Sequence, residues 1–130
     1  MAQEDKELLL KDLCSRLPYG VKVQNVQTEK INTLLSVEYN GNYCTVGNES
    51  VSIRDWFDDY MPYLRPMSSM TEEEEREVRI LWNEDFVGDN NWYHCYPKTT
   101  DFYLSHHLDF RNLIQKGLAL EAPEGMYKTD

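Results

Sequence analysis

The first seventeen residues follow a helical pattern of apolar and polar positions. Leu10, Leu13, Cys14 and Leu17 are spaced i, i+3, i+4 and i+7, which places them on one face of an α-helix. A proline directly after Leu17 cannot continue the helix, because it lacks the backbone N–H. The pattern predicts a helix over roughly residues 5–17, with this stripe facing the core.

Residues 21–53 follow the alternating pattern of β-strands. Asn40-Gly41 lies between two such runs and is a strong hairpin signal, because both central residues of a type I′ turn need a positive φ. We expect an antiparallel meander with one buried face and one wet face. Tyr43 points to the buried face in this interpretation, and Cys44 is a second candidate for it.

An aromatic segment follows the predicted meander. Residues 55–66 carry six large apolar side chains, and Pro62 and Pro66 prevent a long regular element. We interpret the segment as a short helix followed by an extended passage. That passage is expected to lie over the sheet edge or between layers.

A second helix is predicted to begin at Thr71 and to end at Gly88. Thr71-Glu72-Glu73-Glu74 is a capping box, in which each end of the motif satisfies a backbone N–H of the other. The acidic first turn also favours the helix dipole. The stripe expected to face inward consists of Val78, Leu81, Trp82 and Phe86.

Two more short helices are expected near the end of the chain. One covers about residues 100–107. The other begins at Asp109 as its N-cap and ends at Gly117, with Leu113 buried between its two ends.

These elements predict an α+β fold. A small antiparallel β-meander of three to four strands would pack against the N-terminal helix and against two to three C-terminal helices. We expect a single domain over residues 1–130, with residues 1–4 and 126–130 as loose tails.

The negative net charge of the chain argues against two kinds of partner. The chain has 130 residues with 13 Lys and Arg against 23 Asp and Glu, which gives a formal charge of −10. Direct binding to nucleic acid and docking on anionic lipid both need cationic side chains, so we expect neither. The longest compact apolar run is Leu8–Leu10, and the acidic start does not resemble a secretion signal, so we expect a cytoplasmic protein.

Aromatic residues are the most distinctive part of the composition, with 3 Trp, 9 Tyr and 4 Phe. Tyr and Trp are enriched at protein interfaces because they provide rigid area with a polar tip. We therefore expect a non-enzymatic protein-binding module whose partner is another protein. The candidate interaction surface consists of Trp92, Tyr93, Tyr96, Trp56, Phe57 and Tyr60.

Two alternatives remain open. Clustered carboxylates that imitate phosphates would make the chain an acidic mimic of nucleic acid, one that occupies a DNA-binding protein. The candidate acidic surface consists of Asp55, Asp58, Asp59, Glu72, Glu73 and Glu75. The second alternative is a small hydrolase or metal-binding protein that uses His94, His106 and Asp109.

The sequence contains no recognised catalytic motif, and we expect no cofactor. Three separated cysteines, Cys14, Cys44 and Cys95, form neither a disulfide framework nor a zinc ribbon. The spacing of His94, His106 and Asp109 matches no known metal site, so no metal ligand is assigned.

Three stretches of the sequence carry a family resemblance. Residues Lys11–Val23, Tyr63–Glu74 and His106–Tyr127 resemble a family of small uncharacterised proteins of Bacteroides-group gut bacteria and their phages and mobile elements. The resemblance implies a short cytoplasmic protein and an accessory role in a phage or mobile element. It implies no activity and no functional residues.

Overall fold

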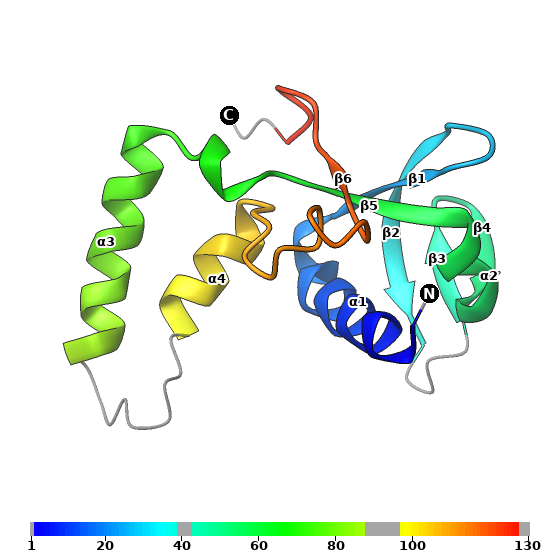
Figure 1. The fold of residues 1–130 in the computed structure, drawn as a ribbon, viewed down its shortest axis with the longest axis horizontal. Helices are drawn as coiled ribbons and strands as arrows, with labels where there is room; N and C mark the ends of the chain where they lie inside the picture. Colours follow the sequence, from blue (N-terminus) through cyan, green and yellow to red (C-terminus); the bar gives the residue numbers. More distant parts are fainter. Residues whose placement is uncertain (1, 39–42, 88–96, 128–130) are drawn as a thin grey trace.

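A computed structural model describes residues 2–38, 43–87 and 97–127, and shows an α+β fold (Figure 1). No helix in these ranges is both long and apolar enough to cross a membrane. The helices are α1 (Gln3–Arg16), α2 (Ile53–Asp59), α3 (Glu72–Val87) and α4 (Pro97–Ser105). The strands are β1 (Lys22–Asn25), β2 (Ile31–Val37), β3 (Tyr43–Val46), β4 (Glu49–Ser52), β5 (Tyr60–Leu64) and β6 (Leu120–Glu121).

The strands form one mostly antiparallel sheet in the order β4-β3-β2-β1-β5-β6. Only the β5–β6 pair is parallel among the described strands. The four strands β1–β4 fall in the predicted region 21–53, but the expected limit of three to four strands is wrong, because β5 and β6 extend the sheet. The extended passage, expected over the sheet edge or between layers, is β5, which lies inside the sheet between β1 and β6, so the expected placement is wrong.

Pro62 is compatible with β5 because of the register. Val26 donates its N–H to the carbonyl of Asp59 at 2.8 Å, and Val23 lies opposite Pro62. Bonds to β1 alternate along β5, so residues 59, 61 and 63 face β1 and the ring nitrogen of Pro62 faces the other side. β6 begins opposite Tyr63 and does not reach that nitrogen, so no ladder bond is lost.

The β2–β3 hairpin contains a bulge. Leu34 lies opposite Val46 and Ser36 lies opposite Thr45, so Leu35 is an extra residue and is 59% exposed. The predicted Asn40-Gly41 turn lies outside the described residues. Cys44 is buried and Tyr43 is 47% exposed, so the inward orientation expected for Tyr43 is wrong.

α1 covers one face of the sheet, and its buried stripe is Leu9, Asp12, Leu13 and Arg16. The predicted stripe was displaced by one residue, and Cys14 is exposed. The reason is an ion pair: Asp12 accepts a 2.7 Å hydrogen bond from Arg16, and both side chains are fully buried. Arg111 donates to the other Asp12 oxygen at 2.6 Å, so charged groups occupy positions that an apolar pattern does not predict.

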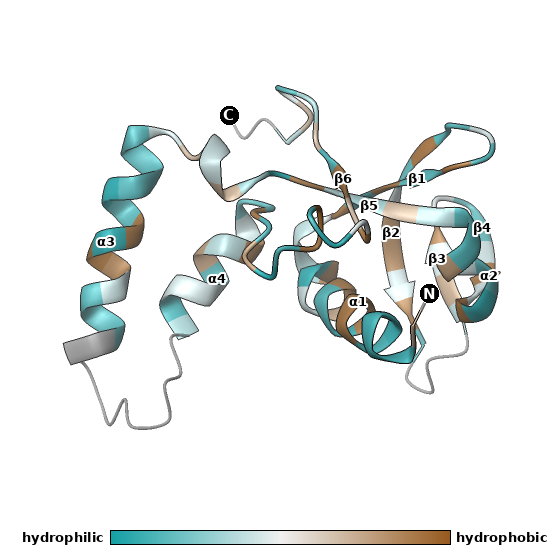
Figure 2. Ribbon diagram, viewed as in Figure 1, coloured by the Kyte–Doolittle hydropathy of each residue, from teal (hydrophilic) through white to brown (hydrophobic). Residues whose placement is uncertain are grey.

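α3 stands beside α4 at one end of the molecule, away from the sheet (Figure 1). The capping box is confirmed by hydrogen bonds of 2.9 Å from Thr71 N–H to Glu74 and of 3.1 Å from Glu74 N–H to the Thr71 hydroxyl. Figure 2 shows an apolar stretch in the middle of α3, which does not cover the sheet. Ile80 is 61% exposed and Trp82 is 45% exposed, so the inward position expected for Trp82 is wrong.

The helix predicted over residues 109–117 is a series of turns instead. Asn112 has a φ of 64°, which interrupts a right-handed helix. The ending is still as predicted, since Leu118 N–H donates to Leu113 O at 2.9 Å and Gly117 N–H donates to Ile114 O at 3.1 Å. The burial predicted for Leu113 is confirmed, because it is 0% exposed.

The two expected tails contain anchored residues. Gln3 and Glu4 belong to α1. Tyr127 is half-buried, and its hydroxyl contacts the backbone of both Lys22 and Tyr63. Tyr127 is therefore held against the sheet, while residues 1 and 128–130 of the two expected tails lie outside the described residues.

Candidate functional site

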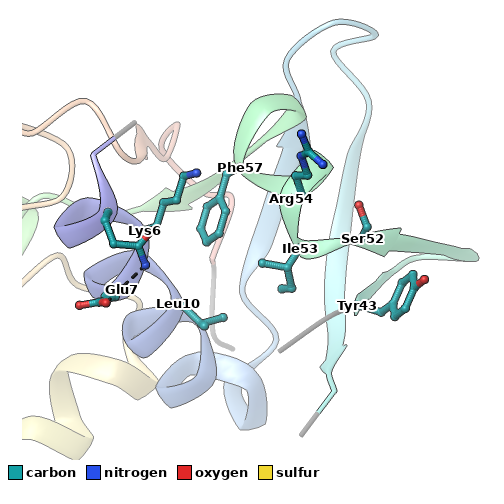
Figure 3. A pocket seen from close by; sticks show the side chains of 9 residues that line it. Lys6, Glu7, Leu10, Tyr43, Ser52, Ile53, Arg54 and Phe57 are labelled. Carbon is teal, nitrogen blue, oxygen red and sulfur yellow. Dashed lines mark hydrogen bonds between the residues drawn. The ribbon is translucent and has the colours of Figure 1, made fainter. Parts of the chain in front are cut away.

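A pocket of about 560 Å³ lies between α1, α2 and the end of the β3–β4 hairpin (Figure 3). We name it the α1–α2 pocket. Its lining residues are Gln3, Lys6, Glu7, Leu10, Tyr43, Ser52, Ile53, Arg54 and Phe57.

Helical spacing brings the lining residues together. Gln3, Lys6, Glu7 and Leu10 are spaced i, i+3, i+4 and i+7 on α1, so they share a face next to the buried stripe. On α2, Ile53 and Phe57 are one turn apart.

α2 is held in place by an N-terminal cap and by aromatic packing. The Ser52 hydroxyl accepts a 3.2 Å hydrogen bond from Asp55 N–H and caps the helix. Trp56 is fully buried, stacks on Tyr60 at 6.0 Å and meets Phe57 edge-to-face at 6.0 Å. Phe57 therefore packs against a buried aromatic ring, that of Trp56. The Phe57 ring is itself half-buried and lines the pocket.

The rim of the pocket carries charge above an apolar floor of Leu10, Ile53 and Phe57. The Lys6 ammonium lies 5.8 Å from the centroid of the Phe57 ring. Arg54 is exposed and makes no ion pair with any residue that the structure describes. The nine lining residues include no histidine, no cysteine and one carboxylate, Glu7.

The structure divides the predicted aromatic surface. Trp56 is 0% exposed and Tyr60 is 6% exposed, so both belong to the core and not to a surface. The sequence does not distinguish the two cases, because an aromatic residue in a proline-flanked segment has the same sequence pattern whether its ring is exposed to solvent or covered by other elements of the fold. Of the three described members, Phe57 alone lines the pocket, and Trp92, Tyr93 and Tyr96 lie outside the described residues.

The predicted acidic residues form two separate groups. Asp55 and Asp58 are exposed on α2, while Asp59 is half-buried and accepts a hydrogen bond from Gln27 at 3.1 Å. The exposed Glu72, Glu73 and Glu75 begin α3, at the opposite end of the molecule (Figure 1).

A second groove, of about 860 Å³, lies beside the first turns of α3. Five carboxylates line it, three from α3 and two from the C-terminal segment: Glu73, Glu74, Glu77, Glu121 and Glu124. Arg65 also lines this groove, but hydrogen bonds of 2.8 and 2.9 Å join its guanidinium to Glu74. The bond from Arg65 lowers the pKa of Glu74 to about 2 against the opposing effect of burial.

The predicted histidine and carboxylate site is not assembled in the described part of the chain. His106 Nδ1 lies 3.0 Å from the Phe102 carbonyl oxygen, and its ring stacks on Phe102. Asp109 is buried, and its two oxygens accept the N–H groups of Leu113 and Ile114 at 2.8 and 2.9 Å. His94 lies outside the described residues, and those inside form no group of three or more metal-ligating side chains.

Sequence reasoning missed the charged and aliphatic lining of the α1–α2 pocket. Lys6 and Leu10 carried a usable signal, because they are one turn apart on α1. No signal linked them to Ile53 and Arg54, which come from a distant part of the chain. Comparisons with protein-family models, with curated proteins and with solved structures find no match to this chain.

Proposed function

We propose that this protein is a non-enzymatic protein-binding module that holds an apolar side chain of a partner protein in the α1–α2 pocket. The observation that carries the proposal is the apolar floor of Leu10, Ile53 and Phe57 in a pocket of about 560 Å³. Pockets of about 300–1,000 Å³ with apolar linings and a few polar groups are typical binding sites. A large side chain that fills such a pocket is the usual anchor of a protein interface.

The surroundings of the pocket support the same proposal. Tyr43 adds an exposed ring at the rim, where a partner would contact it. The buried Trp56 keeps α2 rigid, and a preformed pocket loses less conformational entropy on binding. The sequence resemblance extends the proposal to a cytoplasmic accessory of a phage or mobile element.

The test compares two glutamate substitutions in bacterial lysate capture. Leu10→Glu places a carboxylate on the pocket floor, and Ile80→Glu is the matched control on α3, where Ile80 is 61% exposed. Circular dichroism and thermal melts establish that both variants fold. We expect a protein captured by the wild type to be retained by Ile80→Glu and lost from Leu10→Glu. Equal capture by all three proteins, or no capture by the wild type, would overturn the proposal.

The second groove, beside the first turns of α3, supports a second candidate function, that of an acidic mimic of nucleic acid that occupies a DNA-binding protein. Carboxylates from α3 and from the C-terminal segment converge there, although these segments are far apart in sequence. The test measures displacement of labelled duplex DNA from a basic nucleoid protein. Glu73→Gln with Glu77→Gln should abolish displacement, whereas the matched change of Asp55 and Asp58 to Asn on α2 should preserve it. No displacement by the wild type would reject this candidate.

A further inference from the structure

We infer that the α1–α2 pocket selects a partner segment in which a large apolar side chain lies next to a carboxylate. The inference rests on the proposed protein-binding function and specifies its partner. It concerns the rim of the pocket, whereas the proposed function depends on the floor.

Two cations flank the apolar floor from different elements. Lys6 comes from α1 and Arg54 comes from α2, and Figure 3 shows their side chains on either side of Phe57. Neither side chain forms an ion pair with the described residues, although acidic residues outnumber basic ones in the chain. Both cations are therefore available to a carboxylate brought by a partner.

The remaining charged lining residue does not cancel this pair. Glu7 is the one carboxylate among the lining residues, and it accepts a 3.4 Å hydrogen bond from the Gln3 amide. Glu4, Asp5, Asp55 and Asp58 lie nearby in the sequence of α1 and α2 but do not line the pocket. The lining therefore has two positive groups and one negative group.

The local and the global charge favour different partners. A net charge of −10 attracts basic segments to the molecule as a whole. A partner segment seated in the pocket can place a carboxylate beside Lys6 or Arg54, where direct pairing outweighs repulsion from distant, screened carboxylates. A partner segment that carries both an apolar side chain and a carboxylate matches the apolar floor and the cationic rim of the pocket.

The test is selection of random twelve-residue peptides displayed on phage against the full-length protein. The most enriched peptide is then synthesised with a fluorophore, and its dissociation constant is measured by fluorescence polarisation. We expect the enriched sequences to place Phe, Leu, Trp or Met within two residues of Asp or Glu. Lys6→Gln, Arg54→Gln and the exchange of the peptide acid for its amide should each weaken binding about threefold. Lys11→Gln, an exposed change on α1 outside the pocket, is the matched control and should leave binding unchanged.

The variant Leu10→Glu separates the two levels of the proposal. Peptides that lose binding to Leu10→Glu but bind Lys6→Gln and Arg54→Gln as well as the wild type would overturn the acidic selectivity and leave the protein-binding function standing. A selection that yields no peptide dependent on Leu10 would overturn both.

Discussion

The hydroxyl of Tyr127 accepts a 2.7 Å hydrogen bond from the backbone N–H of Lys22, which lies 105 positions earlier in the chain. The same hydroxyl donates to the carbonyl of Tyr63 at 2.7 Å. Lys22 and Tyr63 would form the next bonded pair of the β1–β5 ladder, since Val23 lies opposite Pro62. The Tyr127 hydroxyl thus bridges two strands at the point where their direct pairing ends.

Removing this hydroxyl should destabilise the protein. Tyr127→Phe keeps the ring, which stacks on His107 at 3.7 Å, but leaves a backbone donor and a backbone acceptor without their partner. We expect a loss of about 1–3 kcal/mol in the free energy of unfolding, measured by urea denaturation. Tyr43→Phe, at a 47% exposed ring, is the control and should be neutral. Equal stability of the two variants would contradict the bridging role.

His107 should make stability depend on pH in a defined window. Burial, assisted by the nearby Arg16 charge, lowers the pKa of His107 to about 4 from an ordinary value of 6.5. The folded state therefore keeps the ring neutral while the unfolded chain takes up a proton as the pH falls below 6.5. Stability is full above pH 6.5, decreases towards pH 4 and levels off below it, with a total loss of about 3 kcal/mol.

Urea denaturation at a series of pH values tests this window. His107→Asn removes the titration, and asparagine tolerates the positive φ of 60° at this position. The slope between pH 6.5 and 4 should flatten in this variant. Glu74 affects stability over a lower pH range. Its pKa of about 2 lies below the ordinary value of 4.5, so its contribution to the free energy of unfolding is lost as the pH falls from 4.5 towards 2. An unchanged slope in His107→Asn would exclude His107 as its cause.

Asp12 should be the most sensitive charged residue. Asp12→Ala leaves Arg16 fully buried without its carboxylate and also removes the partner of Arg111. Breaking a buried pair on one side typically costs about 3–5 kcal/mol. Asp12→Leu combined with Arg16→Met removes both charges and should be closer to the wild type than Asp12→Ala in thermal melts. A double variant that is less stable than the single one would contradict this account.

Leu113→Ala should cost about 2–5 kcal/mol, the range for a leucine whose removal leaves a cavity. Leu113 is 0% exposed and its carbonyl accepts the bond from Leu118 that closes the turn. Ile80→Ala is the control, because Ile80 is 61% exposed on α3. Chemical denaturation that shows less than about 1 kcal/mol for Leu113→Ala would refute its place in the core.

Local signals predicted local structure well. The capping box at Thr71 and the ending at Gly117 depend on groups a few residues apart, so the sequence alone contains all their partners. The strand region before residue 53 is similar, because hairpins pair neighbouring segments. For the same reason the sequence by itself determined the α+β class and the presence of the first helix.

Tertiary structure alone decided which side chains are buried. Trp56 is in the core and Trp82 is 45% exposed, although both lie on helices, α2 and α3. α1 turned its Asp12–Arg16 face inward because Arg111, almost a hundred residues later, completes the pairing. The pocket joins Lys6 to Arg54 in the same way. Whether a side chain is buried, and whether it joins a pocket, depends on which distant segment the fold packs against it. Hydrophobic periodicity within one segment contains no information about that distant segment.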